Sequence, residues 1–537
     1  MVCQGQFTYQ ITEPTKNLSN RFDQEPLEHP VSPAYPAISP PSFPCRPGSS
    51  ILIDCHFERS LTEKQANRWN GKESTRGRCT YCLSFAKWPT PTVDWCDVAR
   101  VIIDILPDVA LLEIFHFYVD VAWTEGWHTL VHVCRKWRNV VFGSPRRLKL
   151  RLYCTENTPV RETIDAWPVL PILVGGSSHE TWEVDNIIAA LEHNDRICQL
   201  DLFQVPSSEM EKVLATMQQP FPALEHIWLQ SKSETEVVPT SFLGGSAPHL
   251  QTLVLFSIPF PGLPKLLLSA IYLVRLHLYD IPHSGYFSPE SMVSGLSALT
   301  SLEILYIKFK SPRSRPDWRR RPPPLTRILL PALTHFEFIG VSEYLEDIAA
   351  RIDAPLLDYF HITLFHQLIF DTPQLTQFIS RTPKFKACDD ALVQFSASGV
   401  RVSTIDEALR LEISCQQSDW QLSSLAQVCH SIFIPAIEHL HIRETHSPSW
   451  QDDIETGQWL ELLHRLPALK DLRISREFMP RIAPTLEELV GGRVTEVLPA
   501  LQTLFLKKIL PSDVQKSIDK FVASRELVGH PISVSYL

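Results

Sequence analysis

The sequence predicts an α/β solenoid, with parallel strands on the concave face and helices on the convex face. One observation is a six-residue motif, apolar-x-x-apolar-x-apolar, that recurs between residues 197 and 506. A second is the helical spacing of apolar residues in segments between these motifs. Repeats of roughly 20–50 residues are typical of solenoids, because each unit buries its apolar face against the next one.

Residues 1–100 are expected to be a disordered or irregular N-terminal region. Nine prolines stand between Pro14 and Pro47, where they oppose helices and sheet ladders. Cys79 and Cys82 form a Cys-x-x-Cys pair, but a closed zinc site needs a second pair, and only single cysteines flank this one. We therefore expect an irregular tail of reduced cysteines without a metal ion, with a zinc site as the alternative.

Residues 101–147 are expected to form a small all-α domain. Its first helix begins at Pro107, since proline suits the first helical position. Apolar residues then follow at helical spacing and form one stripe along this helix. The residues of that stripe are Leu111, Ile114, Phe115 and Tyr118.

A second helix of this domain is expected to end at Gly143. Leu130, Val133, Cys134, Trp137 and Val141 share one stripe of it. On that stripe Cys134 is a small buried hydrophobe, whereas a nucleophile would need an accessible sulfur and a base. The basic residues around it then form solvated helix faces and not a nucleic-acid patch.

Residues 148–537 contain the motifs that predict the strands. The closing apolar-x-apolar step has period two, and seven of ten motifs follow a proline by two residues, where it ends the preceding helix. Helical spacing is clearest in residues 209–217, 343–352 and 514–522. The middle apolar residues of the motifs, spaced by 23 to 32 residues outside one gap, are Leu200, Ile227, Leu253, Leu276, Leu305, Phe336, Phe360, Leu440, Leu472 and Leu504.

These motifs resemble a leucine-rich-repeat array that covers residues 148–537. The array departs from the family pattern, because residues such as Val205, Lys232 and Ile258 stand where the family has a buried asparagine or cysteine. Residues 391–395 and 406–411 are weaker motif candidates within the gap, and they would restore the repeat step.

Residues 104 to about 150 resemble an F-box. The matching motifs are Leu106-Pro107, Leu-Leu-x-Ile-Phe at residues 111–115 and Val-Cys-x-x-Trp at residues 133–137. Combined with degenerate repeats, they resemble the F-box proteins abundant in mushroom-forming fungi (basidiomycetes). Such proteins are substrate-recognition subunits of SCF-type cullin-RING E3 ubiquitin ligases, in which the F-box docks on a Skp-family linker and the repeats bind a target protein.

The resemblance implies a non-enzymatic substrate adaptor in ubiquitin-dependent protein degradation, without a cofactor, that reaches a cullin through the linker. The alternative is a scaffold or interaction module of the same build without ligase engagement. A small helical domain cannot bury all its apolar surface, and a partner would cover the surplus. The same residues could instead pack on the first repeats. The resemblance assigns linker binding to Leu106, Pro107, Leu111, Leu112, Ile114, Phe115 and Val133.

Target binding is expected on the concave face of the solenoid. In each strand, the residue between the last two apolar positions points away from the core. Aromatic and ionisable groups there favour binding, while an ordinary solvated strand face is the alternative. His277 and His361 are three repeats apart, about 14 Å at ~4.8 Å per strand, too far to share a metal ion. The residues expected to bind the target are Trp228, His277, Tyr306, Glu337, His361, His441, Arg473 and Phe505.

Charge and hydropathy narrow the classes of partner. The net charge of −10 opposes a general binder of nucleic acid or anionic membranes. The longest apolar run, residues 266–274, is too short to span a bilayer, and no secretion signal begins the chain, so we expect a cytoplasmic or nuclear protein. The arginine-rich insert at residues 311–325 could contact an acidic partner or nucleic acid, or act as a nuclear signal, although a solvated, mobile loop is the more common explanation. No phosphate-binding loop, metal-ligand helix motif or nucleophile elbow is present.

Overall fold

A computed structural model describes most of the chain beyond residue 105. The chain divides into two compact units, Met1–Ile103 and Asp104–Leu537, and every described residue belongs to the second. The expected irregular tail, with Cys79 and Cys82, and residues 313–325 of the arginine-rich insert lie outside the described residues. The described residues are 106–121, 126–143, 150–167, 169–175, 183–312, 326–365, 372–386, 389–396, 399–414, 422, 425, 437–444, 456–489 and 493–536.

Three helices form the first part of this unit, where the sequence predicted two. They are α3 (Asp108–Val121), α4 (Gly126–Val133) and α5 (Arg135–Gly143). The prediction of a single helix through Cys134 is wrong, because α4 ends at Val133 and α5 begins at Arg135. The Arg138 side chain donates from Nε to the Val131 carbonyl at 3.0 Å, so it satisfies an acceptor beside the break.

A small apolar core holds these helices together. Phe115 is fully buried, and its ring lies 4.7 Å from that of Trp137. Leu150 and Leu170, from the start of the repeats, join the same cluster. Cys134 is half-buried, so the predicted stripe of Cys134 and Trp137 does not form the centre of this core.

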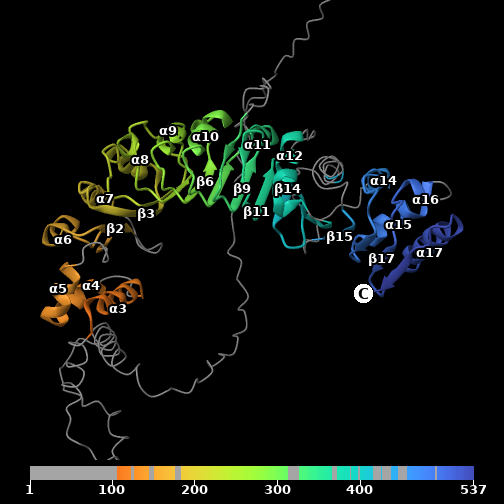
Figure 1. Cartoon of the computed structure of the whole chain (residues 1–537), viewed down its shortest axis with the longest axis horizontal. Coiled ribbons are helices and arrows are strands. Elements are labelled where there is room, and N and C mark those ends of the chain that lie inside the picture. The colour runs from red at the N-terminus through yellow and green to blue at the C-terminus, as the bar shows by residue number, and fades with distance from the viewer. Residues whose placement is uncertain are drawn as a thin grey trace, which may run out of the picture. The chain divides into compact units, whose positions relative to one another are not determined.

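The repeats build one long sheet, which confirms the predicted α/β architecture. The last four residues of each of the ten predicted motifs lie in a strand, and neighbouring strands are hydrogen-bonded in the order β1-β2-β3-β4-β5-β6-β7-β9-β11-β14-β13-β12-β15-β16-β17-β18 (Figure 1). The strands are β1 (Leu150–Tyr153), β2 (Ile172–Gly175), β3 (Ile197–Val205), β4 (His226–Ser231), β5 (Thr252–Phe256), β6 (Arg275–Ile281), β7 (Ile304–Phe309), β9 (His335–Gly340), β11 (Tyr359–Leu364), β12 (Asp390–Ser396), β13 (Gly399–Ser403), β14 (Leu409–Ser414), β15 (His439–Glu444), β16 (Asp471–Ile474), β17 (Thr503–Leu506) and β18 (Ser533–Tyr536). A separate two-stranded sheet pairs β8 (Ile328–Leu329) with β10 (Ile352–Asp353).

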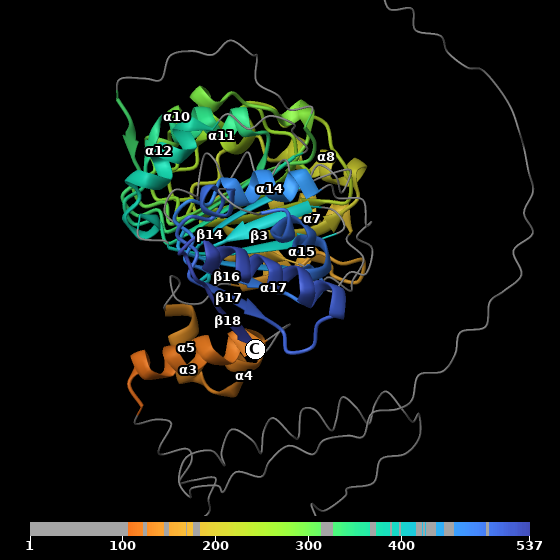
Figure 2. The ribbon, with the colours of Figure 1, turned by 90° about the vertical axis from the view of Figure 1, so that its right-hand side faces the viewer.

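Helices and short 3-10 turns connect the strands and cover one face of the sheet. Figures 1 and 2 show α8 to α12 on the same side of the strands that they follow. None of the described helices is long and apolar enough to cross a membrane. These elements are α6 (Val160–Ala166), α7 (Val184–Leu191), α8 (Ser207–Thr216), η2 (Phe242–Gly245), α9 (Leu263–Leu267), η3 (His283–Gly285), α10 (Pro289–Leu296), α11 (Ser342–Ala349), α12 (Pro373–Arg381), η4 (Pro383–Phe385), α14 (Thr456–His464), α15 (Met479–Glu487), α16 (Arg493–Glu496) and α17 (Ser512–Leu527).

The core lies between this layer of helices and the sheet. The middle apolar residue of each predicted motif is buried; Leu200, Leu305 and Phe360, for example, have no exposed surface. Successive strand residues point to opposite faces, and outward residues such as Trp228 and Tyr306 are partly exposed, whereas Val254 and Ser403 on the same face are buried. One apolar cluster runs from Leu152 to Phe521 and links neighbouring repeats.

The gap in the repeat pattern is filled by an antiparallel meander. Strand β13 pairs antiparallel with both β12 and β14. Strand β12 also pairs parallel with β15, and β14 pairs parallel with β11. The two weaker motif candidates are therefore strands, but the prediction that they restore the repeat step is wrong. Gly399 is required at the start of β13, since a Cβ there would lie 2.4 Å from the Ile413 carbonyl oxygen.

Candidate functional site

The residues predicted to bind a target lie in one row across the sheet face that no described helix covers; we call this row the central row and this side of the sheet the uncovered face. Register pairs join Trp228 to Val254, Val254 to His277, and His277 to Tyr306. The pairing continues through Glu337 and His361, and beyond the meander through His441, Arg473 and Phe505. The sequence pattern therefore identified side chains that the fold aligns.

The meander adds three residues to the central row that the motif search missed. Arg410 pairs with His361, Ser403 with Arg410, and Leu392 with both Ser403 and His441. Sequence reasoning missed Ser403 because its position depends on the antiparallel pairing of β13, which has no repeat period, whereas Arg410 lies on β14, which pairs parallel with β11. A run of alternating apolar residues at 409–413 was the available signal.

Aromatic rings gather on the central row and on the positions two residues further along strands β3 to β7. We call this set the aromatic band; its members are Phe203, Trp228, Phe256, His277, Tyr279 and Tyr306. Ring centroids lie 5.0 Å apart for Phe203 and Trp228, 5.8 Å for Phe256 and Tyr279, and 4.3 Å for His277 and Tyr306. The band offers large, preordered surfaces of the kind that dominate binding energy in protein interfaces.

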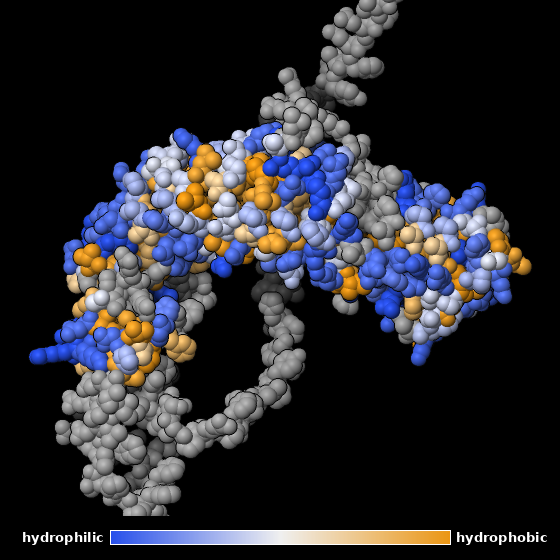
Figure 3. All heavy atoms as spheres, in the orientation of Figure 1, coloured by the Kyte–Doolittle hydropathy of each residue, from blue (hydrophilic) through white to orange (hydrophobic). Residues whose placement is uncertain are grey.

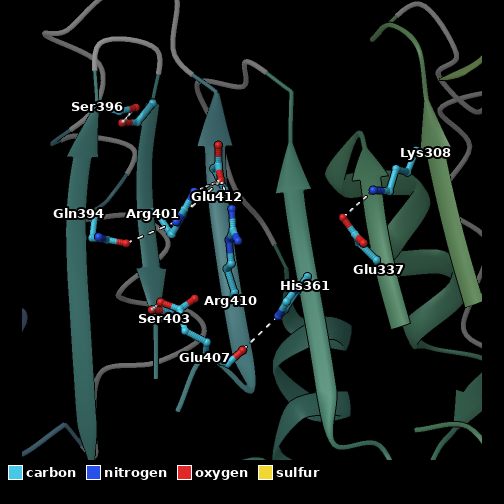
Figure 4. A network of polar contacts seen from close by, with 11 residues as sticks. Lys308, Glu337, His361, Gln394, Ser396, Arg401, Ser403, Glu407, Arg410 and Glu412 are labelled. Atoms are coloured by element: carbon cyan, nitrogen blue, oxygen red, sulfur yellow. Dashed lines mark hydrogen bonds and ion pairs between the residues drawn. The ribbon is translucent and has the colours of Figure 1, made fainter. Parts of the chain in front are cut away.

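Lys308 borders the aromatic band and is held in place by three contacts. Its ammonium lies 4.9 Å from the Tyr279 ring and 5.4 Å from the Tyr306 ring, at cation–π distance. It also forms an ion pair of 2.7 Å with Glu337, a predicted binding residue (Figure 4). Burial raises the pKa of both tyrosines, so their hydroxyls stay protonated at neutral pH.

Two residues of the aromatic band, His277 and Trp228, each have a ring nitrogen that is closed off from solvent. His277 Nε2 and Trp228 Nε1 are buried and find no hydrogen-bond partner among the described residues. His277 Nδ1 contacts the Tyr279 hydroxyl at 3.3 Å. Burial, together with nearby Arg275 and Lys308, lowers the pKa of His277 to about 4, so its imidazole is neutral at physiological pH.

Beyond β11, the same face changes from aromatic to basic. Arg410, Arg401, Arg443 and Arg473 lie on the central row or on the next row of positions; we call them the arginine cluster. Figure 4 shows Arg401 and Arg410 both reaching the carboxylate of Glu412. The two guanidiniums approach the same oxygen, Oε2, at 3.1 Å and 2.9 Å.

The linker-binding residues inferred from the resemblance divide into two groups in the structure. Leu111, Leu112 and Phe115 are buried in the helical core, and Leu106 packs against it, so their assignment to the linker stays a prediction that this burial does not favour. Pro107, Ile114 and Val133 are exposed. The predicted apolar stripe of helix α3 placed Ile114 beside Leu111 and Phe115. In the structure, α3 packs on Leu130 and Val131 of α4, and Ile114 points outward.

Two exposed apolar residues of helix α3 were not predicted. Val109 and Phe117 are 60% and 73% exposed, compared with 41% for Ile114 and 51% for Val133. Hydrophobic side chains of this helical segment reach the surface in Figure 3. We call Val109, Ile114, Phe117 and Val133 the exposed apolar set. The spacing of apolar residues could not predict which of them are exposed, since both faces of α3 carry apolar residues.

One group of potential metal ligands occurs among the described residues, at the start of strands β12 and β15. It consists of Asp389, Glu438 and His439, with ligand atoms within 4.8 Å of one another. Two of them already have partners, because Glu438 pairs with Lys470 at 2.6 Å and His439 Nδ1 contacts Asp471 at 2.7 Å. The arrangement is explained by these ion pairs.

Comparison with known proteins shows a similarity to solved structures. No protein-family model and no curated protein matches the sequence. A structural match is the leucine-rich repeat-containing protein LegL7 from Legionella pneumophila, which aligns with 70% of this chain and 97% of its own length at 11% identity and a TM-score of 0.24. At that TM-score the repeat architecture rests on this chain's own strand order and register.

Proposed function

We propose that the protein is a protein-interaction module that acts as the substrate-recognition subunit of an SCF-type cullin-RING E3 ubiquitin ligase. In this proposal, helices α3 to α5 dock on a Skp-family linker, and the uncovered sheet face binds the target protein. The linker reaches a cullin, and catalysis is supplied by the other subunits, which act on a target held close to them. The observation that carries the proposal is the presence of two different uncovered surfaces, the exposed apolar set and the aromatic band.

The exposed apolar set supports docking of the helical segment on a partner. The core of this segment is already filled by residues such as Leu111, Phe115 and Val141. Four further apolar side chains are then surplus to its own packing, and a cluster of such residues on a small helical segment is typical of an interaction surface. The F-box resemblance names the partner class as a Skp-family linker.

The aromatic band supports binding of a target protein on the sheet. Its rings are held by one another and by Lys308, so little side-chain freedom is lost on binding. These features favour a binding face over an ordinary solvated one.

Co-purification of the full-length protein with a Skp-family linker tests this proposal. The double variant Ile114→Glu/Val133→Glu changes two exposed side chains, so the fold should tolerate it while linker retention falls at least tenfold. Leu268→Glu is the matched control, since Leu268 is similarly exposed at 51% but lies in the repeats. If the folded wild-type chain retains no linker, the proposal is wrong.

The second candidate function is an interaction scaffold without ligase engagement. It is favoured by the aromatic band and the arginine cluster, which require only a bound partner and no linker. Two measurements distinguish the candidates. A scaffold binds its partner with equal affinity in the presence and absence of the linker and cullin, and it does not promote ubiquitination of that partner.

A further inference from the structure

The meander places a concentration of positive charge on the uncovered sheet face. Arg401 and Arg410 face outward from adjacent antiparallel strands, while their neighbours Val400, Val402 and Leu409 are buried in the core. Strands β15 and β16 add Arg443 and Arg473, both exposed. Figure 4 shows the meander part of this surface beside His361.

Positive charge exceeds negative charge among these side chains. The described outward positions of the central row and the next row, from β11 to β16, are His361, Thr363, Arg410, Glu412, Arg401, Ser403, Leu392, Gln394, His441, Arg443, Arg473 and Ser475. Four of these are arginines, and Glu412 is the carboxylate among them, while Asp390 and Asp471 lie on the preceding row of the same face. In a chain of net charge −10, this local excess is a specific feature of the site and not of the whole surface.

Acceptors are also too few for the donors that the arginines present. Each guanidinium carries five N–H donors, whereas Arg401 and Arg410 share one oxygen of Glu412. Gln394 lies between Arg401 and Arg443 in the register, and its amide oxygen faces one or the other arginine according to the amide orientation. Burial and the nearby Arg473 and Arg443 lower the pKa of His441, which reflects the same positive surroundings.

The dimensions of the cluster fit an extended segment. Arg410 and Arg473 are separated by four strand steps through β13, β12 and β15, or about 19 Å at ~4.8 Å per step. An extended peptide covers this distance with roughly six residues. Arg473 also lies 5.2 Å from the Phe505 ring, which keeps its guanidinium over the face.

We propose that the arginine cluster binds an extended segment of the target protein that is rich in aspartate and glutamate. Carboxylates would supply the acceptors that the guanidiniums lack, through charge-assisted hydrogen bonds. The segment would lie across strands β14, β13, β12, β15 and β16, separated from the aromatic band by β9 and β11. Only its identity as a ligase target rests on the proposed function; the binding chemistry does not.

Fluorescence anisotropy with the full-length protein tests this inference. The probe is a labelled peptide of alternating glutamate and serine, about ten residues long, so that it spans the cluster. Arg443→Gln/Arg473→Gln should weaken binding at least tenfold, since it removes two exposed charges. Glu412→Gln should tighten binding, because it removes the carboxylate that competes for Arg401 and Arg410. Arg275→Gln, on the same face at β6, is the matched control and should change nothing.

Three outcomes would overturn the inference. They are equal binding of a lysine–serine peptide, unchanged affinity in the double arginine variant, and tighter binding of a single-stranded oligonucleotide of equal length, which would assign the cluster to nucleic acid. The linker experiment is run on the same variants. If the wild-type chain binds the peptide but not the linker, the ligase proposal is refuted and the inference of an acidic ligand is retained.

Discussion

The regular repeats and the meander use one sheet in two ways. From β3 to β11, each strand pairs parallel with the next, and the outward positions carry aromatic rings. From β12 to β14, the chain turns back on itself without an intervening helix, and the outward positions carry arginines. In the repeats, neighbours on the face come from residues about one repeat apart, whereas in the meander they are separated by 7 or 11 residues, as for Arg401 with Gln394 and with Glu412. A change in topology therefore places a second binding chemistry beside the first.

The largest expected effect comes from breaking the repeat core where it meets the meander. The Phe360 ring is fully buried and lies 5.1 Å from the Phe336 ring and 5.5 Å from the Phe378 ring. Phe360→Ala should lower the free energy of unfolding by about 4 kcal/mol, measured by urea denaturation. Phe505→Ala, on the uncovered face, is the control and should cost below about 1 kcal/mol. Equal losses in both variants would contradict the assignment of the two faces.

Gly399→Ala disturbs the meander while leaving the repeats intact. The added Cβ would meet the Ile413 carbonyl oxygen at 2.4 Å, and backbone cannot move away as a flexible side chain would. We expect a loss of about 2 kcal/mol in the free energy of unfolding. Binding of the glutamate–serine peptide should fall with it, because Arg401 follows Gly399 on β13. Gly143→Ala, where nothing lies within 4 Å of the new Cβ, is the control.

His277→Gln should change how stability depends on pH. The pKa of His277 is lowered from 6.5 to about 4 in the folded chain, so the unfolded chain binds a proton first as the pH falls. The unfolded state then binds more protons, and His277 reduces stability progressively between pH 6.5 and 4. His277→Gln should lessen the decrease in Tm over this interval, measured by differential scanning fluorimetry. An unchanged pH profile would show that His277 is not buried as described.

The smallest expected effect has the opposite sign. Tyr344 is fully buried, with its ring 4.8 Å from Phe309, and its hydroxyl has no hydrogen-bond partner among the described residues. Tyr344→Phe should therefore raise the free energy of unfolding by up to about 1 kcal/mol. Tyr279→Phe provides the comparison, since it loses a contact with His277 and should bring no gain. A destabilising Tyr344→Phe would reveal a partner for the hydroxyl.

The alternation of apolar residues along each strand and the spacing of the motifs made the strands and the central row predictable. A residue such as Tyr306 between two buried positions must point outward if the strand exists at all. In some repeats, apolar residues stand at the position where leucine-rich repeats have a buried asparagine. Val205 and Ile281 are buried at that position, and their carbonyls accept from the backbone N–H groups of Lys232 and Lys310 at 2.9 Å and 3.0 Å.

The remaining features depend on tertiary contacts that have no period. Helix α3 has apolar residues on several faces, so its packing partner decided that Leu112 is buried and Ile114 exposed. The break at Cys134 leaves Val133 outside the core although it shares a helical stripe with Trp137. Arg401 and Arg410 became neighbours only through strand reversal.

The reversed strand β13 also bears on how the chain folds. In a solenoid, order spreads from one repeat to its neighbours, and each parallel pairing must close a loop of about one repeat. The β12–β13 and β13–β14 pairs close over far fewer residues, so their contacts are local and form quickly. We expect the meander to be a starting point from which strand pairing extends in both directions, toward β11 on one side and β15 on the other.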